Sequence, residues 1–171
     1  MSEIVNKVAQ SKIFTFDMEE VLPSLDDIVY FDLKDFLFQG LVLREKQFRG
    51  DLKDIDWNQY QDKIVIVKCS ADAIVPIWAY MLVETYLLPV VAHVGNNEQS
   101  LFSQIIARSI EEIDNEINLS DRPIVIKGCS NVPFKEHVYM EATKFLLPFS
   151  KSLMYGEPCS TVPIYKKRKK A

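Results

Sequence analysis

The sequence predicts an α/β fold with a mostly parallel sheet of at least four strands, helices on both faces, and an N-terminal α/β extension. The first observation is that short β-branched runs alternate with longer helical patterns after Lys63, because such alternation builds parallel sheets through right-handed crossovers. The second is composition: the chain has 171 residues, of which 48% are apolar and 26% are charged. A chain of this make-up buries a core without disulfides or metals, so we expect one domain over residues 1–171.

The N-terminal lobe, residues 1–62, is the least regular part of the chain. Apolar runs predict strands at residues 28–31 and 38–43, and residues 44–53 have the pattern of a short helix. Asp32, Lys34 and Asp35 alternate with aromatic and apolar residues, a pattern typical of an edge strand. No Gly/Ser-rich linker follows the lobe, so we interpret it as an addition to the sheet and not as a second domain.

The core, residues 63–165, repeats a strand followed by a helix. Its clearest element is an amphipathic helix, because apolar residues recur at helical spacing from Leu101 to Ile117 and Asn96 or Asn97 can cap its first turn. The other elements follow from β-branched runs and from apolar segments of helical length. The predicted strands are 64–67, 90–94, 123–127 and 152–155, and the other predicted helices are 74–88 and 133–147.

Charge is distributed unevenly along the chain. The basic tail, residues 166–171, carries five of the 20 Lys and Arg residues, so residues 1–165 have 15 basic against 24 acidic side chains. An acidic body repels a phosphate backbone, which argues against a nucleic-acid partner unless the tail binds alone. We interpret the tail as a solvated terminus.

Two observations concern the location of the protein. The N-terminal residues lack the apolar run and cleavage site of a secretory signal, so we expect a cytoplasmic protein. The most apolar stretch, residues 73–92, contains two prolines and Glu84 and falls short of the uninterrupted run that a membrane span needs. We therefore expect no membrane partner, and free thiols instead of disulfides at the three cysteines.

A Cys-Ser pair follows two of the predicted strands. Residues 64–89 and 124–148 share the order β-branched strand, Cys-Ser, Val-Pro, Tyr-Met and Leu-Leu-Pro, which either a duplication or the general likeness of buried elements explains. Residues 159–163 resemble a third, truncated copy. The carboxyl ends of parallel strands are where α/β sheets place ligand sites. If the strands that end near 67, 127 and 155 are neighbours, we expect the sulfurs of Cys69, Cys129 and Cys159 within about 4 Å of one another.

Three cysteines at one edge form a metal-binding pattern. Helix amides that face a sulfur favour its thiolate, and Asp72 or Asn131 could cap the helices after Cys69 and Cys129. Three such charges repel each other unless a cation lies between them, and both zinc and iron–sulfur clusters are held by thiolates. We therefore predict zinc or an iron–sulfur cluster bound by Cys69, Cys129 and Cys159. The candidates for a fourth ligand are Asp72, His93, Glu157 and water.

Three other interpretations stay open. Cysteine is a small apolar residue suited to a strand end, so all three could simply pack inside a non-catalytic interaction protein. One cysteine could be the nucleophile of a thiol enzyme that transfers sulfur or an acyl group, with helix amides stabilising negative charge. The loops could also bind an anion or small ligand through hydroxyls and amides. The residues expected to bind there are Ser70, Asp72, Ser130, Asn131 and Ser160.

Four segments carry a family resemblance: residues 31–35 (FDLKD), 69–76 (CSADAIVP), 127–131 (KGCSN) and 155–163 (YGEPCSTVP). Together they resemble an uncharacterised bacterial family, domain of unknown function 2480, over nearly the whole chain. The family name implies no activity. Its members are sometimes encoded beside iron–sulfur assembly proteins, which implies a protein partner in sulfur or metal handling.

Overall fold

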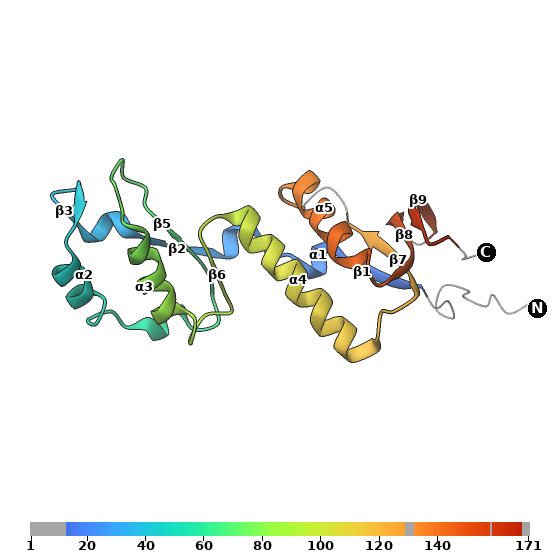
Figure 1. Cartoon of the computed structure of the whole chain (residues 1–171), viewed down its shortest axis with the longest axis horizontal. Coiled ribbons are helices and arrows are strands. Elements are labelled where there is room, and N and C mark those ends of the chain that lie inside the picture. Colours follow the sequence, from blue (N-terminus) through green and yellow to red (C-terminus); the bar gives the residue numbers. More distant parts are fainter. Residues whose placement is uncertain (1–12, 129–131, 158, 169–171) are drawn as a thin grey trace, which may run out of the picture. The chain divides into compact units, whose positions relative to one another are not determined.

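The computed structural model describes residues 13–128, 132–157 and 159–168, which form two compact units (Figure 1). Unit 1 consists of Met1–Pro23 and Phe102–Ala171, and unit 2 of Ser24–Leu101. Each unit has a parallel sheet of its own. The predicted α/β class is confirmed, because the described part of the chain has five α-helices and a mostly parallel four-stranded sheet.

Unit 2 is built around a three-stranded parallel sheet. β2 (Ile28–Asp32) and β6 (His93–Gly95) pair with opposite sides of the central strand β5 (Ile64–Lys68). Val65, Ile66 and Val67 are buried, as expected for the central strand of a parallel sheet. α3 (Ile77–Leu87) connects β5 to β6. The other elements are η1 (Leu25–Asp27), η2 (Leu33–Phe36), β3 (Leu37–Phe38), β4 (Val42–Leu43), α2 (Glu45–Asp51) and η3 (Trp57–Tyr60).

Unit 1 contains the four-stranded sheet, in the order β1-β7-β8-β9. β1 (Phe14–Asp17), β7 (Arg122–Lys127) and β8 (Ser150–Glu157) are parallel, whereas β9 (Ser160–Lys166) returns antiparallel to β8. α5 (Lys135–Leu146) connects β7 to β8, and α1 (Met18–Val21) follows β1. α4 (Glu98–Ile117) begins in unit 2 and belongs to unit 1 from Phe102 onward. Its predicted N-terminal cap is confirmed, since the Ser100 N–H donates to Asn97 at 2.8 Å.

The two units share one plan. In each, an N-terminal strand pairs parallel with a central strand, and a helix leads from the central strand to a third strand on its other side. The connecting helices bury the same positions of the repeated sequence, 79, 83 and 87 in α3 and 138, 142 and 146 in α5. The repeat in residues 64–89 and 124–148 therefore corresponds to a repeated β-α unit.

Several predictions about pairing and bounds are wrong. The predicted strands do not form one sheet, because β5 and β6 pair in unit 2 and β7 and β8 in unit 1. Residues 159–163 are no third copy, since the chain there enters the hairpin strand β9. Residues 38–43 form the turn and strands of the β3–β4 hairpin, and β1 went unrecognised within the lobe. That helices cover both faces of a sheet stays a prediction.

A helix that crosses a membrane needs a long and uninterrupted apolar stretch, which can be sought in the helices of the two units. None of those in the described ranges is both long enough and apolar enough to cross a bilayer.

Candidate functional site

In unit 1, an ion pair joins the carboxyl ends of β1 and β7. Asp17 ends β1, caps α1 by accepting the Glu19 N–H at 3.1 Å, and lies opposite Lys127 in the sheet register. The Lys127 ammonium donates to the other oxygen of Asp17 at 2.7 Å. This hydrogen bond lowers the pKa of Asp17 despite burial, and it raises the pKa of Lys127. Both groups therefore stay charged, and the pair ties the two strand ends together.

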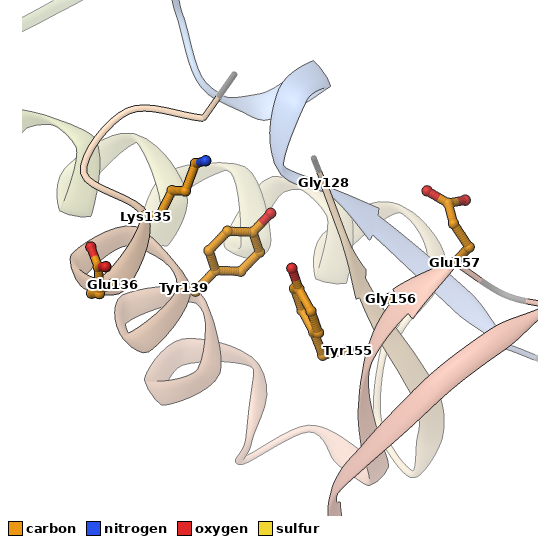
Figure 2. A pocket seen from close by; sticks show the side chains of 7 residues that line it. All are labelled: Gly128, Lys135, Glu136, Tyr139, Tyr155, Gly156 and Glu157. Carbon is orange, nitrogen blue, oxygen red and sulfur yellow. The ribbon is translucent and has the colours of Figure 1, made fainter. Parts of the chain in front are cut away.

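A pocket of about 630 Å³ opens at the same edge, between α5 and the ends of β7 and β8 (Figure 2). Its walls are the rings of Tyr139 on α5 and Tyr155 on β8, which meet edge to face with centroids 5.4 Å apart. In Figure 2 the Lys135 ammonium lies on the side to which the tyrosine hydroxyls point. Glu136 and Glu157 also line the pocket. It therefore combines aromatic walls, one cation and two carboxylates.

Two glycines keep this pocket open. A Cβ atom at Gly128 would collide with the Tyr139 hydroxyl and lie 3.1 Å from the Cβ of Met18. Gly156 has φ +119°, and a Cβ there would lie 2.7 Å from the Ser160 carbonyl oxygen. A side chain at either position would push the pocket wall or the β8–β9 hairpin out of place.

At the equivalent edge of unit 2, a carboxylate binds the backbone that follows β5. Asp32 ends β2, and its Oδ1 accepts the N–H groups of Ser70 and Lys34, each at 3.0 Å. Burial by itself would raise the pKa of Asp32, but the hydrogen bonds from Ser70 and Lys34 and the Lys34 charge lower it to about 2. The N–H of Ser70, one of the residues predicted to bind an anion or small ligand, is therefore already occupied by this side chain.

Cys69 lies beside this carboxylate but not at the start of a helix. α3 begins at Ile77 and is preceded by Pro76, so the predicted cap at Asp72 is wrong and no helix amides follow the sulfur directly. The thiol is half-buried, packs against the core of unit 2 and lies 3.7 Å from the Ala71 carbonyl oxygen. Burial is the main cause that raises the pKa of the Tyr80 hydroxyl. These contacts fit a packed cysteine.

The three cysteines were expected to converge because the strands before them were expected to be neighbours, and the strand order does not meet that condition. β5, which precedes Cys69, is not a neighbour of β7 or β8. Cys159 is exposed, where the β8–β9 hairpin turns, and Ser160 begins β9. Cys129, Ser130 and Asn131 lie outside the described residues. Among the residues that are described, no three His, Cys, Asp or Glu side chains are grouped as metal ligands.

The residues predicted as a fourth metal ligand, His93, Asp72 and Glu157, lie in different parts of the fold. His93 pairs with Ile64 at the start of β5, whereas Cys69 follows the end of that strand. Five residues of strand span roughly 16 Å, too far for one metal ion to bind both. Asp72 lies in the exposed loop after Cys69, and Glu157 ends β8.

Sequence reasoning missed Lys135, Tyr139, Tyr155 and the Asp17–Lys127 pair as site residues. A signal for Asp17 was present, because residues 13–22 (IFTFDMEEVL) match residues 28–37 (IVYFDLKDFL), with Asp17 aligned to Asp32. Both strands end in an aspartate that caps the following short helix. Lys135 lies in no repeated motif.

Comparison with known proteins yields one match. The family model described as a protein of unknown function (DUF2480) matches residues 2–167. No curated protein and no solved structure matches the chain.

Proposed function

We propose a small-ligand-binding function for this chain, which belongs to the DUF2480 family of unknown function. The observation that carries the proposal is the unit 1 pocket at the carboxyl ends of the parallel strands β7 and β8. Open α/β sheets bind their ligands at this edge, and a volume of about 630 Å³ suits a small molecule. The proposed ligand has the chemistry of an aromatic amino acid.

The carboxylate of such a ligand has two partners in the pocket. Within the described part of the chain, the Lys135 ammonium forms no ion pair and the Tyr155 hydroxyl no hydrogen bond, although both line the pocket. A charge-assisted hydrogen bond from an ammonium is among the stronger polar contacts that proteins make. The Tyr139 ring offers an apolar surface beside these donors.

The ammonium of the ligand has partners as well. Glu136 and Glu157 line the pocket with Lys135, and Glu157 also interacts with the charge of Lys127. Because both signs of charge border the pocket, a zwitterion can place one of its charges near each sign. An aromatic side chain would complete the fit by packing against the tyrosine walls.

Calorimetric titration of the full chain tests the proposal with L-phenylalanine, phenylpropionate, which lacks the ammonium, and phenethylamine, which lacks the carboxylate. We expect L-phenylalanine to bind most tightly, and Lys135→Gln to weaken it by about tenfold or more. Lys144→Gln removes the same charge from an exposed position on α5 and should leave binding unchanged. Equal binding of the three probes, or equal effects of the two variants, would refute the assignment.

A zinc or iron–sulfur centre remains a second proposal. It is supported by the parallel pairing of β7 with β8, since Cys129 follows the first strand in sequence and the exposed Cys159 follows the second. Metal and acid-labile sulfide are measured on protein purified anaerobically without a histidine tag. A three-cysteine centre should contain about one zinc, or iron with sulfide, and each of Cys69→Ser, Cys129→Ser and Cys159→Ser should remove it. Metal-free protein, or loss in only one variant, would reject that centre.

The remaining predictions concern the cellular location of the protein, its partner and a thiol-enzyme activity. A cytoplasmic location and a protein partner in sulfur or metal handling stay predictions. A thiol enzyme finds no support at Cys69, because this residue packs against the core of unit 2 and no helix begins directly after it.

A further inference from the structure

We propose that the outer edge of β9 binds an acidic protein segment in extended conformation. β9 (Ser160–Lys166) pairs with β8 on one side and has no second partner among the described residues. Pro163 lies within it, as is typical of edge strands, and offers no N–H, so an added strand would pair with the other residues of β9. A strand edge of this kind can pair with an added strand from another protein.

The end of β9 is basic. A groove of about 1130 Å³ is lined by Lys151, Lys166, Lys167 and Arg168, with Asp121 as the carboxylate among its lining residues. Asp121 pairs with Lys167 at 3.2 Å, and the Lys167 N–H donates to the Lys151 carbonyl at 2.9 Å, which extends the hairpin into the groove. Three cations therefore remain for carboxylates of a partner.

Apolar side chains accompany these charges. Val162 is 58% exposed, Ile164 54% and Tyr165 38%, in a strand that is exposed along most of its length. An added strand of alternating acidic and apolar residues would cover them and bring its carboxylates to the lysines.

The combination favours a peptide over other anions. A nucleic acid would use the cations but has no main chain to pair with a strand edge, and Tyr165 is the one aromatic ring beside this groove among the described residues. An anionic membrane would likewise leave the strand edge unpaired. An acidic extended peptide uses the edge, the apolar side chains and the charges together.

Fluorescence anisotropy tests this with the full chain and a labelled eight-residue peptide of alternating glutamate and valine. We expect binding that weakens as salt increases, and a further loss when alternate peptide nitrogens are methylated, because methylation removes donors and keeps the charge. The double variant Lys151→Gln/Lys166→Gln removes two of the three available cations and should weaken binding by about three- to tenfold. Lys46→Gln/Lys53→Gln removes the same charge from exposed positions of unit 2 and should have no effect.

The controls also separate this surface from the unit 1 pocket. Lys135→Gln should leave peptide binding unchanged, so the two proposals fail independently. Thermal unfolding verifies that each variant is folded. The proposal is overturned if the methylated peptide binds equally well, if the two double variants behave alike, if the peptide does not bind, or if oligothymidylate or phosphatidylserine vesicles bind more tightly than the peptide.

Discussion

At the residue scale, the carboxylate of Asp32 links the segments that follow β2 and β5 at the carboxyl edge of the unit 2 sheet. It joins η2, through the Lys34 N–H, to the loop after β5, through the Ser70 N–H. Its side chain is 14% exposed, so these hydrogen bonds are partly shielded from water. The carboxylate therefore takes up the Ser70 N–H, which an external anion could otherwise bind.

We expect Asp32→Asn to lower the free energy of unfolding by about 1–2 kcal/mol at neutral pH. Because the folded-state pKa is lowered to about 2, this contribution is present above the unfolded-state pKa of about 4 and disappears as the pH falls through 2. Urea unfolding at several pH values measures it. Asp35→Asn, at an exposed position of the same η2, is the control, and an equal loss in both variants would contradict the assigned role.

Gly128 is the residue on which the pocket wall depends most directly. Gly128→Ala should destabilise the protein by about 1–3 kcal/mol, because the added methyl collides with the Tyr139 hydroxyl. Gly50→Ala is the matched control: its methyl meets nothing within 4 Å in α2, so it should stabilise the helix by about 0.5–1 kcal/mol. Denaturant unfolding gives both values. A Gly128→Ala protein as stable as the parent would show that Tyr139 is free to move.

At the element scale, the hydrophobic periodicity of α3 does not indicate which face of the helix is buried. Its sequence IWAYMLVETYL has one charged residue, so no polar face indicates which side packs inward. The structure buries Ala79, Val83 and Leu87 and leaves Met81 61% exposed. In α5 the same positions are buried, and there charged residues on the other faces indicate the orientation.

The two faces of α3 should therefore respond differently to substitution. Val83→Ala should reduce the free energy of unfolding by about 2 kcal/mol because it leaves a cavity in the core. Met81→Gln should change it by less than about 0.5 kcal/mol because the side chain is exposed. Chemical denaturation compares them. A large loss from Met81→Gln would mean that a partner covers this face of the helix.

At the scale of the whole molecule, the two units have the same arrangement of strands and connecting helix, and they could unfold together or separately. Leu87 in α3 and Leu146 in α5 occupy equivalent, fully buried positions, each within its own unit. We expect either leucine-to-alanine change to lose about 2–5 kcal/mol. Hydrogen exchange should rise in β5 and β6 for Leu87→Ala and in β7 and β8 for Leu146→Ala. If both variants raise exchange throughout, the chain unfolds as the single domain that its sequence predicts.

Local features were predictable because they depend on residues close in the chain. The run Ile64–Lys68 is β-branched enough to be recognised as a strand, α4 has a clear apolar stripe, and Asn97 is a cap by its side-chain chemistry. The matching segments 64–89 and 124–148 likewise indicated a repeated β-α unit, since a repeated pattern of burial leaves a repeated pattern of sequence.

Pairing and the site were decided by tertiary structure. Nothing in the composition of β5 says that its neighbours are β2 and β6 and not β7, because any parallel strand offers the same backbone donors and acceptors. The pocket likewise depends on a lysine and a tyrosine from α5, a tyrosine from β8 and a glycine after β7, which lie apart in sequence. Folding brings them together through strand order and crossover, and neither is encoded in the spacing of any one motif.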